Sequence, residues 1–139
     1  MEMNFTAQEE LKFSSTIENL SLVEDHVDNV CKKNNISEDH YGNIIIAITE
    51  AVNNAITHGN KGDQSKDVTL RLSLEQNTLV CEVDDQGNGF NYESLPDPTS
   101  PENLEMEHGR GVFLMKALAD ELEFEENGSL VRLTFGLDG

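Results

Sequence analysis

Two polar side chains stand one helical turn apart in a segment that is otherwise rich in apolar residues. Glu50 and Asn54 are four positions apart, so on an α-helix they project from the same side. A carboxylate and a carboxamide on a helix that is apolar nearly all round need partners, because an unpaired polar group is costly to bury. The alternative interpretation is a solvated stripe on a surface helix, and this pattern alone leaves both open.

A carboxylate followed by glycines forms the second candidate. Asp85 continues the apolar alternation of residues 79–83, so its side chain is predicted to point toward the apolar face, whereas that of Asp84 points away. An inward carboxylate needs a hydrogen-bond donor from the protein or from a ligand. Gly87 and Gly89 follow at once, and glycine permits a positive φ or a close approach of the backbone to a ligand. A simple surface turn has the same sequence pattern.

Two further motifs could contact an anion or line a pocket. Gly109, Arg110 and Gly111 stand at the start of a predicted helix, where outward N–H groups and the helix dipole favour an anion. A glycine-rich hinge is the alternative. Ser129 shares a face with the apolar positions of the last predicted strand, so its hydroxyl is predicted to point inward. The alternative there is a turn residue bonded to its own backbone.

The elements that must hold these residues follow from the periodicity of the apolar positions. Ser37 is a suitable N-cap for the second helix, and Gly59 is a suitable stop. The region before the third helix has no clear period and contains all three prolines, which is typical of a functional loop. The order predicts an α+β fold in which helices cover one face of a mainly antiparallel sheet. The predicted elements are a strand at 9–15, helices at 17–33 and 37–58, a hairpin of strands at 68–74 and 79–83, a helix at 109–120, and a second hairpin with strands from 122 and from 131 to 137, joined by a turn at 127–128.

Length and charge limit the possible functions. The chain has 139 residues, which predicts one domain spanning 1–139. Its 9 basic and 27 acidic residues give a formal net charge of −18. Such a surface repels nucleic-acid phosphates and anionic lipids, so we expect no direct nucleic-acid partner and no membrane partner. No apolar run approaches the roughly 20 residues that a membrane-spanning helix needs.

The cysteines and the N-terminus indicate the compartment. Cys31 and Cys81 are the only cysteines, too few for a disulfide framework or a set of zinc ligands. Free thiols in a reducing environment are therefore expected. The N-terminus has neither a basic region nor an apolar region of the kind that signal peptides carry. We predict a cytoplasmic location.

Each motif is weak alone, but their order and spacing together resemble the GHKL (Bergerat) ATPase superfamily. Within it, the chain is similar to the small anti-sigma-factor serine/threonine kinases of bacterial partner-switching systems, over residues 10–137. The resemblance implies a Bergerat fold, an α+β two-layer sandwich with a mainly antiparallel mixed sheet and three helices on one face. It rests on Glu50-Ala-Val-Asn-Asn54, Asp85-Gln-Gly-Asn-Gly89, Gly109-Arg-Gly111 and Gly128-Ser129, and for the branch on Asn54-Ala-Ile-Thr-His58-Gly59-Asn60 and His108-Gly-Arg-Gly-Val-Phe-Leu-Met115.

The resemblance implies a role for each site residue. Asn54 matches the asparagine that coordinates the Mg²⁺ bridging the ATP phosphates, and Glu50 matches the proposed general base. Asp85 matches the aspartate that hydrogen-bonds the adenine amino group, above a floor of Gly87 and Gly89.

The remaining matches lie later in the chain. Gly109 and Gly111 match the second glycine box, which meets the phosphates, with Arg110 between them as a basic residue placed to neutralise phosphate charge. Val112 replaces a commoner leucine, and Ser129 stands where many members have a threonine near the adenine. Residues 91–108 correspond to the ATP lid.

The resemblance also implies partners. The leading hypothesis is a kinase that phosphorylates a serine or threonine of a STAS-domain anti-anti-sigma protein and that sequesters a sigma factor or another regulatory target. A homodimer is expected by analogy. Two alternatives are an ATP-dependent binding module that switches partners without phosphotransfer, and a stand-alone histidine-kinase-like ATPase domain. Because the chain is so acidic, binding of ATP should depend strongly on Mg²⁺.

Overall fold

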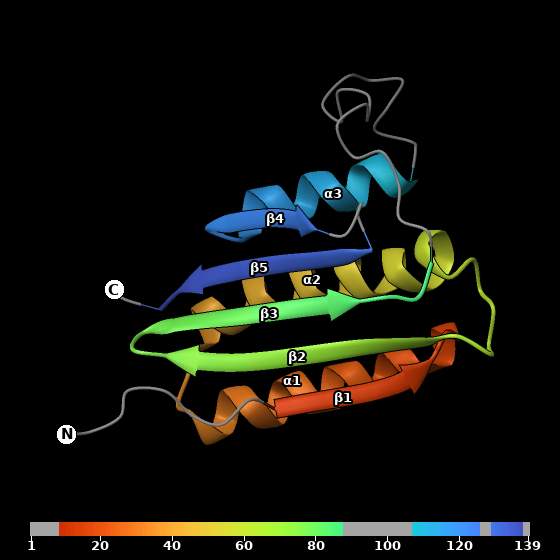
Figure 1. Ribbon diagram of the computed structural model, residues 1–139. Helices are drawn as coiled ribbons and strands as arrows, with labels where there is room; N and C mark the ends of the chain where they lie inside the picture. Colours follow the sequence, from red (N-terminus) through yellow and green to blue (C-terminus); the bar gives the residue numbers. More distant parts are fainter. Residues whose placement is uncertain (1–8, 88–106, 126–128, 138–139) are drawn as a thin grey trace.

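Five strands form a single sheet, and three α-helices cover one of its faces (Figure 1). The computed structural model describes residues 9–87, 107–125 and 129–137, with the backbone alone for 107–110. The elements are β1 (Glu9–Ser14), η1 (Ile17–Asn19), α1 (Leu20–Lys33), α2 (Glu38–Asn54), η2 (Ala55–Gly59), β2 (Asp67–Glu75), β3 (Thr78–Asp84), α3 (Glu107–Leu118), β4 (Glu121–Glu125) and β5 (Leu130–Gly136). The predicted α+β sandwich is confirmed.

The sheet has the strand order β1-β2-β3-β5-β4. All four neighbouring pairs are antiparallel, so no parallel pair of a mixed sheet occurs among the described strands. The two predicted hairpins lie at the centre and at one edge. Strand β5 pairs with both β3 and β4, which brings the end of the chain beside residues near its middle.

The core lies between the helices and the inner face of the sheet. Alternate residues of β2 are buried, as the period-2 pattern predicted, and Leu70 and Leu72 are almost fully enclosed. Helix α2 buries a broad stripe that includes Ile44 and Ile48. Enclosing each such side chain contributes about 1.5–3 kcal/mol to stability. Cys31 and Cys81 are buried free thiols, as expected.

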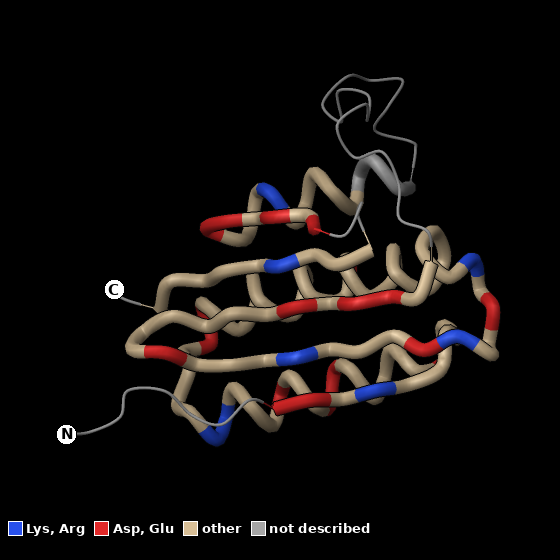
Figure 2. The backbone as a smooth tube through the Cα atoms, viewed as in Figure 1, with Lys and Arg blue, Asp and Glu red and all other residues tan. Residues whose placement is uncertain are grey.

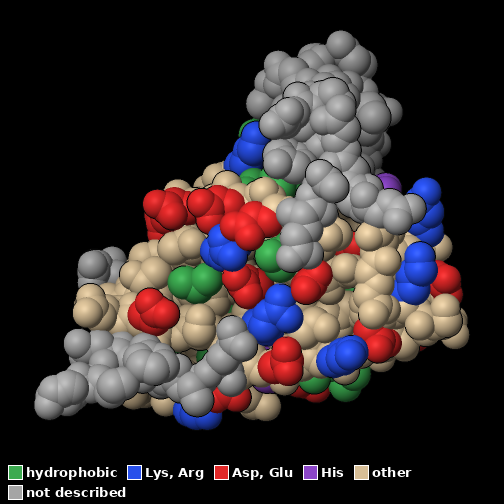
Figure 3. Space-filling view, viewed as in Figure 1, with side chains coloured by type: hydrophobic (Ala, Val, Ile, Leu, Met, Phe, Trp, Pro, Cys, Tyr) green, Lys and Arg blue, Asp and Glu red, His purple; other side chains and the backbone are tan. Residues whose placement is uncertain are grey.

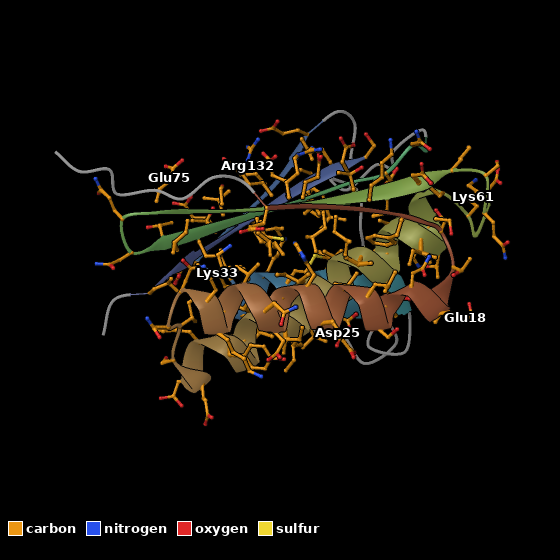
Figure 4. All side chains as sticks on the ribbon, turned by 90° about the horizontal axis from the view of Figure 1, so that it is seen from below. Glu18, Asp25, Lys33, Lys61, Glu75 and Arg132 are labelled. Atoms are coloured by element: carbon orange, nitrogen blue, oxygen red, sulfur yellow. The ribbon has the colours of Figure 1, made fainter. Side chains whose placement is uncertain are left out.

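The outer face of the sheet carries the charges. Figure 2 shows basic positions on β2 and β5 beside acidic positions on β3 and β4, and Figure 3 shows these side chains gathered over the strands. Arg71 pairs with Glu82 and with Asp84, each at 3.2 Å. Arg132 pairs with Glu82 at 2.8 Å and with Glu125 at 2.5 Å. Viewed edge-on, Arg132 lies on the side of the sheet away from the helices (Figure 4).

Helix α2 begins as predicted and ends differently. The Ser37 side chain accepts a hydrogen bond from the backbone N–H of His40 at 3.4 Å, which satisfies one free donor of the first turn. The α-helix ends at Asn54, and a single π-helical turn continues to Gly59. The predicted stop at Gly59 is therefore confirmed, but the widened last turn was not predicted, because it leaves no period in the sequence.

Smaller differences concern the other helices. The predicted first helix starts with the 3-10 turn η1, and α3 begins at Glu107, two residues before the predicted start, and ends at Leu118. Most of the predicted lid, the 127–128 turn and Gly89 lie outside the described residues. Among the helices that the structure describes, none is both long enough and apolar enough to cross a membrane.

Candidate nucleotide-binding site

The end of α2 and the end of β3 lie at the same end of the sandwich (Figure 1). A pocket opens there, between these two ends and helix α3. Its walls are mainly apolar. Helix α3 contributes Met115, and the other wall residues come from α2, η2, β3, β4 and β5 or lie next to them. Asn54, Asp85 and Ser129 provide side-chain polar groups in this apolar setting, and His58 lines it too. Apolar walls with a few polar groups are typical of small-molecule sites. The other wall residues are Ala51, Ala55, Val83, Phe124 and Val131, with Gly59 adding backbone.

Asn54 is the most unusual polar group of the pocket. The residue is only 9% exposed, and both Oδ1 and Nδ2 are buried without a hydrogen-bond partner in the described part of the chain. Leaving such a group unsatisfied costs about 1–3 kcal/mol. A solvated stripe on a surface helix does not fit this burial. An ion or ligand that reaches the amide would supply the missing partner.

Glu50 lies one turn before Asn54, and helix α3 packs directly against this side of α2. A Cβ added to Gly111 would lie 3.0 Å from Asn54 Nδ2 and 3.0 Å from Glu50 Oε1. Glycine at this position therefore lets the two helices approach without covering either polar group. The structure thus brings together three residues that the sequence assigned to one site.

The position of Gly111 within α3 changes the expected geometry of the glycine box. Gly111 is the fifth residue of the helix, beyond the first turn, whereas Gly109 lies within that turn, where N–H groups lack partners inside the helix. The expectation of helix-start amides thus fits Gly109 but not Gly111. A contact of either residue with phosphate stays a prediction, and the side chain of Arg110 lies outside what the structure describes.

Asp85 follows β3 directly, and its carboxylate lines the pocket as predicted. Its backbone N–H donates to the Ser129 carbonyl at 2.9 Å, which joins the ends of β3 and β5. The Gly87 N–H donates to Asp85 Oδ1 at 2.8 Å. Burial raises the pKa of Asp85 to about 6, although the Gly87 N–H acts in the opposite direction. The neighbouring Asp84 pairs with Arg71 on the outer face, so the predicted alternation is confirmed.

The sequence suggested that Gly87 allows a positive φ or a close approach to a ligand, but the structure shows a different reason for glycine here. It is not among the described residues with a positive φ. A Cβ at Gly87 would instead overlap the carbonyl group of Gly59, with the carbonyl carbon at 2.6 Å. The residue is thus needed for close packing of protein backbone. A role as the floor under a base stays a prediction.

Two other predicted site residues have opposite placements. Ser129 is 8% exposed and lines the pocket, as expected from its inward-facing position. Val112 is 3% exposed and belongs to the hydrophobic core, and it is not among the residues that line the pocket. Sequence reasoning missed Met115 and Phe124 as pocket walls, because their apolar periodicity is the same as that of core residues.

The described residues do not form a complete metal site. Among the described residues, no group of three His, Cys, Asp or Glu side chains is arranged to hold an ion. Mg²⁺ commonly binds through one or two protein oxygens together with substrate phosphates. Asn54 Oδ1, which has no partner among the described residues, fits such a shared site, because it is a neutral oxygen ligand in the wall of the pocket.

The raised pKa of Asp85 makes a prediction for stability. Asp85→Asn is expected to raise the free energy of unfolding of the ligand-free protein by about 2–3 kcal/mol near pH 7. Burial disfavours the ionised carboxylate in the folded state above its pKa of about 6. The wild-type protein should therefore lose stability as the pH rises from about 4 to about 6, and the gain from the substitution should vanish as the pH falls back to about 4.

Urea unfolding of both proteins across this pH range measures the difference. Asp84→Asn is a matched control, because Asp84 is ion-paired with Arg71 on the outer face and should give no such gain. A gain from Asp85→Asn that did not change with pH would contradict burial of the charge as its cause.

Comparison with known proteins gives consistent matches over nearly the whole chain. A family model described as a histidine kinase-like ATPase domain matches residues 13–135. An anti-sigma F factor from Thermoanaerobacter sp. (strain X514) is 31% identical over 137 residues, which are 95% of this chain and 95% of that protein. A serine-protein kinase RsbW from Bacillus licheniformis is 29% identical over 132 residues, which are 90% of this chain and 82% of that protein.

A solved structure has a similar fold. The crystal structure of the RsbU and RsbW domains of Rv1364c from Mycobacterium tuberculosis matches with a TM-score of 0.69 and 19% sequence identity. The match covers 95% of this chain and 33% of the mycobacterial chain. At this level of identity, the similarity establishes the fold alone.

Proposed function

The chain belongs to the histidine kinase-like ATPase domain family, and on that premise we propose that it is an ATP-dependent serine/threonine protein kinase. Its substrate would be a STAS-domain anti-anti-sigma protein, and its second partner a sigma factor or another regulatory target. The names of the relatives, a serine-protein kinase and an anti-sigma factor, support this assignment. The observation that carries it is the buried amide of Asn54, which has no partner among the described residues and lines the same pocket as Asp85.

The adenine end of the pocket is built on Asp85. Its carboxylate is an acceptor for the amino group of adenine, and the apolar walls suit the faces of a purine ring. The Gly87 N–H donates to one carboxylate oxygen, so loss of the amino group would leave the carboxylate without the donor that the base supplies, which is the physical basis for selecting this base. Ser129 lies beside Asp85 and offers a hydroxyl close to the base.

The phosphate end is built on α2 and α3. Bound Mg²⁺ would offset the negative charge of the phosphates, and Asn54 Oδ1 is the protein ligand that we assign to it. The free N–H groups in the first turn of α3 provide further positive character. These local groups would allow so acidic a chain to hold one triphosphate, although an extended polyanion is repelled.

Glu50 is the residue that we assign as general base. It lies beside Asn54 and Gly111, one helical turn from the assigned metal ligand. From there its carboxylate would take the proton from the attacking serine or threonine hydroxyl. Phosphoryl transfer depends chiefly on positioning and charge neutralisation, so one such base beside an ion site is sufficient chemistry.

Phosphotransfer to a protein tests the proposed function. The chain would be mixed with Mg-ATP and the STAS-domain protein encoded nearest to it, and the products would be examined by mass spectrometry. Phosphate on a serine or threonine of that protein supports the kinase. ATP binding with no transfer to any such candidate would favour a binding module that switches partners. ATP hydrolysis alone would favour a stand-alone ATPase domain.

Metal dependence is a separate expected result. ATP affinity measured by calorimetry should fall by about 100-fold or more when Mg²⁺ is replaced by excess EDTA. The reason is the formal charge of −18 on the chain, which opposes a bare triphosphate. Adenosine, which carries no phosphate, is the control ligand and should bind equally with and without EDTA. Equal ATP binding in both conditions would contradict this account of the phosphate end.

A further inference from the structure

The chain leaves helix α2 through a widened turn that ends beside the pocket. After Asn54 the helix continues as one π-helical turn, Ala55–Gly59, and the N–H of Asn60 donates to the Ala55 carbonyl at 2.8 Å. Isolated π turns inside helices occur frequently at functional sites. A π turn contains one more residue than an α-helical turn. After this turn, Gly59 and Asn60 contact the segment that follows β3.

Gly59 packs against the carboxylate of Asp85. A Cβ at Gly59 would overlap that carboxylate, with Asp85 Cγ at 2.5 Å and Oδ1 at 2.9 Å. The carbonyl of Gly59 in turn occupies the space where Gly87 would carry a side chain. The two glycines therefore fix how closely the π turn approaches the Asp85–Gly87 segment, and any side chain at Gly59 would displace the carboxylate.

Asn60 ties the same segment to the rest of the fold. It is 1% exposed, and its Oδ1 accepts a hydrogen bond from the backbone N–H of Gln86 at 2.8 Å. Its Nδ2 donates to Ser15 Oγ at 2.7 Å and to the carbonyl of Asp67 at 3.0 Å. One buried side chain thus connects the end of β1, the start of β2 and the residue next to Asp85.

The bond to Gln86 has a direct consequence for Asp85. It holds the N–H of the peptide that joins Asp85 to Gln86, so it restrains the backbone that carries the carboxylate. From the other side, the Gln86 side chain accepts from the backbone N–H of Asp67 at 2.6 Å. Two hydrogen bonds therefore restrain Gln86, the residue after Asp85. The Asp85 carboxylate itself packs against Gly59, where a side chain would overlap it.

We infer that Gly59 and Asn60 are positioning residues that aim the Asp85 carboxylate at the amino group of a 6-aminopurine, and that they thereby determine the base specificity of the site. The inference rests on the proposed function, because it takes Asp85 as the group that reads the base. Neither residue needs to touch the nucleotide. Their contribution is the direction of an acceptor that the Gly87 N–H restrains at Oδ1 alone.

The test compares two nucleotides that differ only at the 6-position. Affinities for ATP and for purine riboside triphosphate, which lacks the amino group, are measured by calorimetry in Mg²⁺. The wild-type protein is expected to prefer ATP by about 10- to 100-fold. Asn60→Ala and Gly59→Ala are expected to bring the two affinities within about threefold of each other, chiefly by weakening ATP, since the analogue makes no hydrogen bond through an amino group.

Two variants separate positioning from stability. Ser15→Ala breaks the same buried network at Ser15 but leaves the bond to Gln86, so it should lower the thermal midpoint and keep the preference for ATP. Asn60→Asp retains an oxygen for the Gln86 N–H but places a second carboxylate oxygen where Nδ2 donated, so it should lower the thermal midpoint and keep the preference. If Asn60→Ala does not fold, Gly59→Ala and Asn60→Asp decide the question, because they predict opposite outcomes.

The failures are distinguishable. A wild-type protein that does not bind ATP would overturn the proposed function. A wild-type protein that binds both nucleotides equally would overturn Asp85 as the group that reads the base, and the positioning role with it. A wild-type preference that persists undiminished in folded Asn60→Ala or Gly59→Ala would overturn the positioning role alone. Loss of the preference in Ser15→Ala would also overturn it, since general loosening of the network would then suffice.

Discussion

Replacing Glu50 with glutamine is expected to slow phosphoryl transfer by about 100- to 10,000-fold while changing the affinity for Mg-ATP by less than about threefold. Glutamine keeps the size and the hydrogen-bonding ends of the side chain, but it cannot accept the proton of the attacking hydroxyl. The packing of Gly111 against Glu50 should be preserved, because the two side chains have nearly the same shape. The effect should therefore appear in the rate constant rather than in binding.

Single-turnover transfer to the STAS-domain protein, together with calorimetric ATP binding, separates the two quantities. Glu24→Gln is the matched control, since it makes the same chemical change at an exposed position of α1. An E50Q protein that transferred phosphate at the wild-type rate would show that Glu50 is not the base. An E50Q protein that failed to bind ATP would assign the residue to binding instead.

The second large effect is expected at Asn54 and has two parts of opposite sign. Asn54→Leu should stabilise the ligand-free protein by about 1–2 kcal/mol, because it replaces a buried amide that has no partner in the described part of the chain with an apolar group of similar shape. The same substitution should weaken binding of Mg-ATP by about 100-fold and leave the residual binding insensitive to EDTA. A stabilised protein that has lost its metal dependence is hard to attribute to misfolding.

Asn43→Leu provides the control for this substitution. Asn43 is exposed on the same helix, so the change should alter stability by no more than about 0.5 kcal/mol and leave ATP binding intact. If Asn54→Leu destabilised the protein instead, the amide would have a partner in solution that the structure does not show. If metal-dependent binding survived, Asn54 would not be the ligand.

Much of the fold could be predicted because its signals are local. The alternation over 68–74, the cap at Ser37 and the stop at Gly59 each depend on neighbouring residues, and each is confirmed. The family predicted from the order of the motifs is confirmed as well. The motifs also predicted which polar residues lie together, since Asn54, Asp85 and Ser129 line one pocket.

The parts that could not be predicted depend on contacts distant in sequence. Asn60 bonds to Ser15 and to Gln86, which are 45 and 26 residues away, and no periodicity reports such a link. The reason for glycine at Gly87 is equally remote, because the obstacle is the carbonyl of Gly59. For Val112, the motif predicted a residue of the nucleotide site, but the side chain is buried in the hydrophobic core.

The charge of the chain also has a clearer meaning in the structure. Several acidic residues on the outer face of the sheet are paired with Arg71 and Arg132, and these residues are not among those that line the pocket. Among the described residues that line the pocket, Asp85 is the one with a carboxylate, and burial disfavours its ionisation. Acidity is therefore a property of the surface, and it does not prevent a nucleotide from binding where Mg²⁺ and helix N–H groups offset its charge.

The homodimer and the cytoplasmic location stay predictions.

The most direct test of the central claim is a crystal structure of the protein with Mg²⁺ and a non-hydrolysable ATP analogue. The account predicts the adenine amino group at hydrogen-bonding distance from the Asp85 carboxylate, the metal ion on Asn54 Oδ1, and the γ-phosphate on the side of Glu50. A nucleotide bound elsewhere, a base that turns another edge toward Asp85, or a metal ion that does not contact Asn54 would contradict it.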